Sequence, residues 1–143
     1  FAEAARPAGI NIEVVRKPND GYWSNTWLKD PWVASYWGGR PTEDWMFSQV
    51  YSENAIATGW SETKFVHQKF EKLLVQARAE LNDAKRREMY VEMQQIVHDN
   101  CSVIIPIFSA YGHASTSNVK RGSKVASNWE FDGHKNAERW WMG

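Results

Sequence analysis

The chain has 143 residues, of which 43% are hydrophobic, so it suits one domain or one lobe of a larger protein. Lys plus Arg and Asp plus Glu number 17 each, and this zero net charge argues against a general nucleic-acid binder. No apolar run approaches the roughly 20 residues of a membrane span. The single cysteine, Cys101, cannot form a disulfide within the chain or a thiolate metal cluster.

The first third of the chain is predicted to alternate helices with strands. Residues 1–8 have helical character, and they read as the end of a longer helix, so we interpret the chain as an excised domain. Residues 10–15 alternate in polarity like a half-buried strand, and residues 32–37 form an apolar run of strand type. With a short helix at residues 22–29 between them, this order is typical of an α/β layer with parallel strands.

The middle of the chain is predicted to be helical. Residues 41–51 form one helix, residues 54–60 a loop, and residues 65–81 an amphipathic helix. Its apolar stripe consists of Val66, Phe70, Leu73, Leu74, Ala77 and Leu81. Asn82 or Asp83 then caps a second amphipathic helix over residues 84–100. Because so few residues join them, these two helices are expected to pack antiparallel.

The last part is predicted to begin with a buried strand. Residues 102–108 are almost continuously apolar, whereas residues 113–124 are polar and read as a loop. The tail that follows carries four aromatic residues without a clear period: Trp129, Phe131, Trp140 and Trp141. We expect them to dock on this domain or on a partner lobe.

The turn after residues 32–37 is the candidate ligand site. It combines glycines that leave the backbone uncovered, a guanidinium with several hydrogen-bond donors, and flat aromatic walls. The predicted ligand-binding residues are Trp37, Gly38, Gly39, Arg40, Asp44 and Trp45. The alternative is a tight turn with a surface arginine and two core tryptophans.

No arrangement of residues indicates catalysis. Glu43 and Asp44 are adjacent, and neighbouring helical residues point about 100° apart, so they would not face one substrate together. The serines lack a G-x-S-x-G context, and no pair of histidines has the spacing of a metal site. We therefore predict a protein that is not an enzyme, with no cofactor and no metal.

Five segments, taken in order, resemble one family, the family 5 extracellular solute-binding proteins. These are the dipeptide- and oligopeptide-binding receptors of ABC importers. WGGRPTEDWMF at residues 37–47 is similar to the family's "W-G-x-D-Y-x-x-P-x-x-F" segment, and FEKLLVQAR at residues 70–78 to its "FD-x-L-L-x-x-A-R" helix. DAKRREMY at residues 83–90 resembles "D-x-x-K-R-x-x-L-Y", VIIPIF at residues 103–108 resembles part of "A-P-V-I-P-L-Y", and AGINIEV at residues 8–14 resembles "A-G-I-x-V-E-L".

The resemblance implies the second lobe of a two-lobed periplasmic-binding-protein type II fold, an α/β structure with a mainly parallel sheet flanked by helices. Residues 1–108 would be the truncated lobe, and residues 109–143 the return segment and tail towards lobe one. The implied function is capture of a peptide-like or other small polar solute between two lobes and delivery to a membrane permease. The implied partners are therefore the ligand, the permease and an N-terminal lobe. The implied location is the periplasm, or a lipid-anchored place on the surface of a bacterium without an outer membrane.

The chain departs from the family pattern at Arg40, which stands where the peptide receptors carry an acidic residue for the peptide's amino group. An arginine binds carboxylate, phosphate or sulfate groups. The hypothesis is therefore a ligand with an anionic group at this point, or a sugar-like ligand stacked on Trp37 and Trp45.

Two other classes of protein stay open. The tryptophan content and the carboxylates are also compatible with a carbohydrate-binding module or a carbohydrate-active enzyme domain. The third reading is an α/β interaction domain whose tryptophans all lie in its core.

Overall fold

The computed structural model describes residues 1–126 and 129–143. They divide into a first unit, Phe1–Ser35, and a second unit, Tyr36–Gly143. The predicted division after residue 108 stays a prediction, and its tail segment includes residues 127–128, which lie outside the described part.

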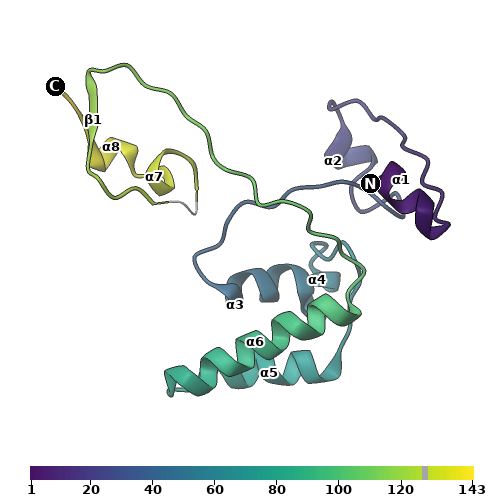
Figure 1. The fold of residues 1–143 in the computed structure, drawn as a ribbon. Coiled ribbons are helices and arrows are strands. Elements are labelled where there is room, and N and C mark those ends of the chain that lie inside the picture. Colours follow the sequence, from purple (N-terminus) through teal and green to yellow (C-terminus); the bar gives the residue numbers. More distant parts are fainter. Residues whose placement is uncertain (127–128) are drawn as a thin grey trace. The chain divides into compact units, whose positions relative to one another are not determined.

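The first unit contains three short helical elements (Figure 1). Helix α1 spans Ala2–Ala5 and continues into the 3-10 helix η1 at Arg6–Ala8, so the prediction of a helix over residues 1–8 is confirmed. Gly9 ends η1 with a φ of 77°, in the left-handed region that a residue without a side chain adopts easily. Helix α2 spans only Tyr22–Asn25, shorter than predicted.

Polar and aromatic contacts hold the loop residues of the first unit. Lys17 Nζ lies 3.3 Å from Asp30 Oδ2, and the Tyr22 hydroxyl donates to the carbonyl of Ala34 at 2.7 Å. The Trp23 ring packs edge-on against Trp27 at 5.6 Å. Thr26 is the only buried residue among those of this unit, all of which the structure describes, so these contacts do not amount to a core.

The core lies in the second unit, between a helical hairpin and the helices before it. Helix α5 (Gln68–Ala79) and helix α6 (Asp83–Asn100) lie side by side, which confirms the predicted pairing (Figure 1). The helices before the hairpin are α3 (Glu43–Met46), the π-helical turn η2 (Phe47–Tyr51) and α4 (Glu53–Ala57). The helix predicted over residues 41–51 thus begins two residues later, at Glu43. The loop predicted at residues 54–60 is wrong for residues 54–57, which belong to α4, and right for residues 58–60.

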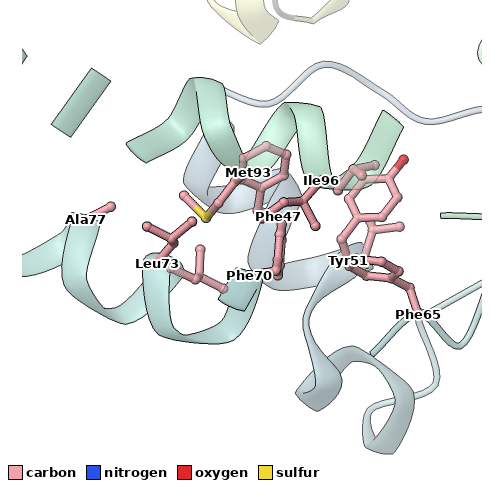
Figure 2. Packing of buried hydrophobic residues seen from close by; sticks show 11 residues of the cluster. Phe47, Tyr51, Phe65, Phe70, Leu73, Ala77, Met93 and Ile96 are labelled. Atoms are coloured by element: carbon pink, nitrogen blue, oxygen red, sulfur yellow. The ribbon is translucent and has the colours of Figure 1, made fainter. Parts of the chain in front are cut away.

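Rings form the centre of this core (Figure 2). Phe70 is fully buried, and its ring lies edge-on to Phe47 at 5.4 Å and to Phe65 at 5.6 Å. Met93 from α6 is equally buried and fills the space facing α5. The cluster comprises Phe47, Val50, Tyr51, Phe65, Phe70, Leu73, Leu74, Ala77, Met93, Ile96 and Val97.

Side chains cap the two long helices, and of these caps the sequence predicted only the one at the start of α6. Asn82 Oδ1 accepts from the Lys85 amide at 3.1 Å at the start of α6, and His67 Nδ1 accepts from the Phe70 amide at 3.3 Å at the start of α5. Helix α5 starts after the His67 cap and ends at Ala79, inside the predicted limits of 65–81, so Val66 and Leu81 fall outside it and are 55% and 92% exposed.

The C-terminal segment forms a small hairpin. Strand β1 (Val119–Arg121) pairs antiparallel with strand β2 (Trp140–Met142), with Lys120 opposite Trp141. Between them lie the short helices α7 (Glu130–His134) and α8 (Asn136–Arg139). Asp132, only 2% exposed, joins these elements, because its Oδ1 accepts from Arg139 at 2.8 Å and its Oδ2 from the Trp140 indole at 3.2 Å.

The predicted α/β fold with a mainly parallel sheet is wrong. Helices make up 45% of the described residues and strands 4%, and their one sheet is the antiparallel pair of β1 and β2. The three segments expected as strands, residues 10–15, 32–37 and 102–108, belong to no sheet in the described part of the chain. Apolar alternation favours an extended backbone, but a strand also needs a second backbone beside it for its hydrogen bonds.

The segment expected to be a buried strand is largely exposed. Ile107 and Phe108 have exposed fractions of 74% and 94%, and in residues 102–108 only Val103 is partly buried, where it packs against the core cluster. Among the described helices, none is both long and apolar enough to span a membrane.

Replacing Phe70 with Ala should lower the free energy of unfolding by about 3–5 kcal/mol, because it leaves a cavity between the rings of Phe47 and Phe65. Urea denaturation of the purified protein measures this loss. Val75→Ala is the matched control on the same helix, since Val75 is 68% exposed, and it should change stability by less than about 0.5 kcal/mol. Equal losses in the two variants would contradict the described core.

Candidate functional site

The candidate site begins in an irregular segment, not at the end of a strand. Residues 36–42 have no regular secondary structure. Of the expected strand, turn and helix, the strand is therefore missing, and the turn and the helix are present. Helix α3 starts at Glu43, where Thr42 Oγ1 accepts from the Trp45 amide at 3.4 Å. Thr42 therefore takes the capping role and places Arg40 two residues before the cap.

Arg40 lies among indole rings. Its guanidinium carbon is 5.6 Å from the ring centre of Trp37, 5.6 Å from that of Trp45 and 5.7 Å from that of Trp129. A cation over an indole face contributes about 0.5–2 kcal/mol, depending on how far it is removed from water. We call Arg40 with these three rings the Arg40 cage.

Backbone and side-chain oxygens hold the guanidinium in this cage. Arg40 Nε donates to Gln49 Oε1 at 3.0 Å, and Nη1 donates to the carbonyl of Gly38 at 2.9 Å and, more weakly, to that of Gly39 at 3.4 Å. Within residues 1–126 and 129–143, no carboxylate lies within ion-pair distance of Arg40. Its positive charge is therefore balanced only by dipoles and ring faces.

These contacts bear on both ligand hypotheses for the turn. Since Nε is bound to Gln49, the edge of the guanidinium formed by Nε and Nη2 is not open for a two-pronged contact with an anion. A sugar stacked on Trp37 or Trp45 would have to use a ring whose face already carries the guanidinium. The remaining donors of Arg40 are those of Nη2.

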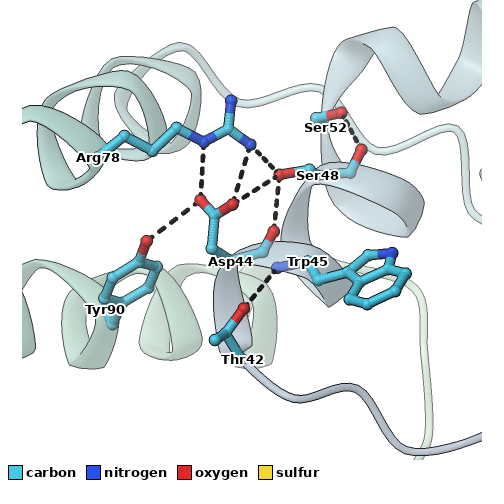
Figure 3. A network of polar contacts seen from close by, with 7 residues as sticks. All are labelled: Thr42, Asp44, Trp45, Ser48, Ser52, Arg78 and Tyr90. Carbon is cyan, nitrogen blue, oxygen red and sulfur yellow. Dashed lines mark hydrogen bonds and ion pairs between the residues drawn. The ribbon is translucent and has the colours of Figure 1, made fainter.

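Asp44, a predicted ligand residue, instead connects three helices (Figure 3). Arg78 from α5 binds its carboxylate through Nε at 2.9 Å and Nη2 at 3.1 Å, and the Tyr90 hydroxyl from α6 donates to Oδ1 at 3.1 Å. Arg78 Nη2 also contacts Ser48 Oγ, which in turn donates to the carbonyl of Asp44 at 2.6 Å. We call Asp44, Ser48, Arg78 and Tyr90 the Asp44 network.

The Asp44 network raises the pKa of two of its side chains, Tyr90 and Arg78. Burial, and next the carboxylate of Asp44, raise the pKa of Tyr90 to about 12. The hydrogen bond to Asp44 raises the pKa of Arg78 above its ordinary value. Both groups therefore keep their protons at neutral pH, and Asp44 accepts from donors on two helices.

Two residues next to the turn were not predicted from the sequence. Trp129 completes the Arg40 cage, and the Tyr111 hydroxyl accepts from the Gly39 amide at 3.2 Å. Both lie in segments without a regular period, so no pattern in the sequence could have placed them here. Among the described residues, no group of three or more His, Cys, Asp or Glu side chains could hold a metal ion.

Asp44→Asn should lower the free energy of unfolding by about 1–2 kcal/mol, because Arg78 loses its charged partner at a partly exposed site. Asp83→Asn is the matched control, since Asp83 pairs with Arg86 on the surface at 86% exposure; it should cost less than about 0.5 kcal/mol. Urea denaturation compares the two, and equal losses would mean that Asp44 does not join the helices.

Stability should fall as the pH rises from about 10 to about 12. Tyr90 and Tyr51 have a pKa of about 12 in the folded protein, against 10.0 for an ordinary tyrosine, and burial is the first cause for both. In this range the unfolded chain has released phenolic protons that the folded chain keeps, so the unfolded state is favoured. Urea denaturation across this pH range tests it, and Tyr90→Phe should make the loss with pH less steep. An unchanged slope would contradict the role given to Tyr90.

Comparison of the chain with protein-family models, curated proteins and solved structures found no match. The relation to the solute-binding proteins therefore stays a prediction from the five sequence segments.

Proposed function

We propose that this chain is part of the solute-binding component of an ABC importer. In this role it binds a small polar or peptide-like solute together with a further lobe of the receptor, and it delivers the solute to a membrane permease. The protein acts outside the cytoplasmic membrane and performs no chemistry on the solute.

The observation that carries the proposal is the convergence of three of the resembling segments in the Asp44 network. Asp44 comes from the segment at residues 37–47, Arg78 is the last residue of FEKLLVQAR, and Tyr90 is the last residue of DAKRREMY. Arg78 and Tyr90 are motif positions of the resemblance and both bind one carboxylate, although Asp44 itself stands where the quoted family pattern has proline. The meeting of two motif positions at one carboxylate supports a structural reason for their spacing.

The same network supports the turn as the binding site. Helix α3 continues directly into η2, and this stretch, Glu43–Tyr51, is too short to be stable by itself. Its attachment to α5 through Arg78 and to α6 through Tyr90 holds the preceding turn, with Arg40 and the glycines, on the edge of the core. No described feature favours the carbohydrate-module alternative, since the guanidinium already lies over Trp37 and Trp45.

A thermal-shift screen of the full-length protein against peptides, organic acids, phosphorylated sugars and oligosaccharides tests the proposal. A ligand that binds only the folded state adds about 2.7 kcal/mol to the free energy of unfolding at 100 times its Kd, and it therefore raises the melting temperature. Trp45→Ala should weaken the binding of any solute found by about tenfold, because it removes a wall of the site.

Trp141→Ala is the matched control for Trp45→Ala. The two tryptophans are similarly exposed, at 55% and 49%, but Trp141 belongs to β2 and not to the Arg40 cage. The control should leave affinity unchanged. If no solute in the panel stabilises the protein, or if the two variants weaken binding equally, the proposed function or its site is wrong.

A further inference from the structure

A group of cations and apolar side chains lies on the C-terminal hairpin, outside the Arg40 cage and the Asp44 network. Strand β1 and the residues after it carry Lys120, Arg121 and Lys124, and all three residues are exposed. Strand β2 ends with Trp141 and Met142, whose exposed fractions are 55% and 72%. We call these five residues the hairpin patch.

The pairing of the two strands brings a cation and a ring of the patch to one face. Lys120 and Trp141 are directly opposite in the antiparallel pair, so their side chains leave the same face of the hairpin. A methyl group built on Gly143 would lie 3.3 Å from Lys120 Cγ and 3.8 Å from Trp141 Cδ1, so both side chains border one small space. An ammonium on a long apolar stem next to an indole is a combination that favours the boundary between water and lipid.

The positive charges of the patch have no acidic partner within the hairpin. Within residues 1–126 and 129–143, no carboxylate lies within ion-pair distance of Lys120, Arg121 or Lys124. Each acid of the hairpin instead lies within that distance of another basic side chain, and these acids are Glu130, Asp132 and Glu138. The charge that complements the patch is therefore a negative one from outside the described chain.

The apolar members of the patch decide which anionic partner fits. A single-stranded nucleic acid would offer phosphates for the cations and bases for Trp141, but Met142 has no ring on which a base can stack. The zero net charge of the chain also gives no wide basic surface for a nucleic acid. A lipid bilayer offers phosphates to the cations and an apolar boundary to both Trp141 and Met142.

The direction of approach follows from the strand geometry. Trp141 and Met142 are neighbours in β2, so their side chains leave opposite faces of the hairpin. Both lie at the end of the strand, where Met142 pairs with Val119. An approach by this end of the hairpin, and not by one of its faces, therefore brings both side chains to the lipid.

We propose that the hairpin patch binds the surface of a membrane that contains anionic phospholipid. The cations contact lipid phosphates, and the side chains of Trp141 and Met142 enter the headgroup region. The binding is weak and reversible, because each cation near such a surface raises the affinity only about fivefold. The inference goes beyond the proposed function and does not depend on it; where both hold, the patch keeps the receptor close to the membrane that contains its permease.

Co-sedimentation of the purified 143-residue chain with lipid vesicles tests the proposal. One set of vesicles contains equal parts of phosphatidylglycerol and phosphatidylcholine, and the other contains phosphatidylcholine alone. We expect binding to the mixed vesicles to be at least about tenfold tighter than to the neutral ones, and to weaken at about 1 M salt, where the Debye length is only about 3 Å. Equal binding to both sets, or to neither, would overturn the proposal, and so would tighter binding to a single-stranded DNA oligonucleotide.

Lys120→Gln combined with Lys124→Gln should weaken binding to the mixed vesicles about 25-fold, because two contributions of about fivefold are lost. Lys72→Gln combined with Lys85→Gln is the matched control, since it removes the same charge from exposed positions on α5 and α6. The control should change vesicle binding by less than about twofold, because those charges lie outside the contact. An equal loss in the two double variants would mean that only the overall charge attracts the chain, and the proposal would fail.

Trp141→Ala should weaken binding to the mixed vesicles by about five- to tenfold, because it removes the ring that enters the headgroup region. Trp141→Tyr keeps an aromatic side chain that favours the interface, so it should retain most of the affinity. Trp32→Ala is the matched control in the first unit, since Trp32 is 63% exposed, and it should leave binding unchanged. Unchanged binding in Trp141→Ala, or an equal loss in Trp32→Ala, would overturn the proposal.

The outcomes separate this inference from the proposed function. If a solute in the screen stabilises the protein and the mixed vesicles do not bind, the inference fails and the proposed function stands. If the vesicles bind through the patch but no solute stabilises the protein, the inference stands and the proposed function fails.

Discussion

The contact of Asp44 with Arg78 and Tyr90 is the interaction on which the rest of the second unit depends. It joins the short helical stretch of α3 and η2, Glu43–Tyr51, to the only long helices in the described part of the chain. A helix this short has too few backbone hydrogen bonds to offset the entropy of ordering it. The Asp44 carboxylate accepts hydrogen bonds from both α5 and α6, and Phe47, directly after α3, is buried. Together these contacts supply the stabilising free energy that the helix does not have by itself.

The turn before α3 combines an uncompensated cation with aromatic surroundings. Arg40 is held by carbonyls, by Gln49 and by indole faces, none of which carries a full negative charge. Such a guanidinium stays attractive to an anion from outside, because ring quadrupoles and dipoles stabilise the charge without neutralising it.

The parts of the fold that depend on local sequence were predictable. The stripe of Phe70, Leu73, Leu74 and Ala77 recurs at helical spacing and is buried, and Asn82 caps the helix that follows. The strands were not predictable, because residues 10–15, 32–37 and 102–108 have the composition of strands but lack the paired backbone that would make them strands. Hydrophobicity shows that a segment can be buried, but it does not show what would cover it.

The sequence by itself determined the helical hairpin, the Asn82 cap of its second helix, and the grouping of Trp37, Gly38, Gly39, Arg40 and Trp45 in one turn. These features arise from residues close together in the chain. Only the tertiary structure decided that Asp44 faces Arg78 and Tyr90, and that Tyr111 and Trp129 lie beside the turn. Contacts between residues far apart in the chain depend on how the helices and loops pack together. The hydrophobic period or residue spacing within one segment does not predict that packing.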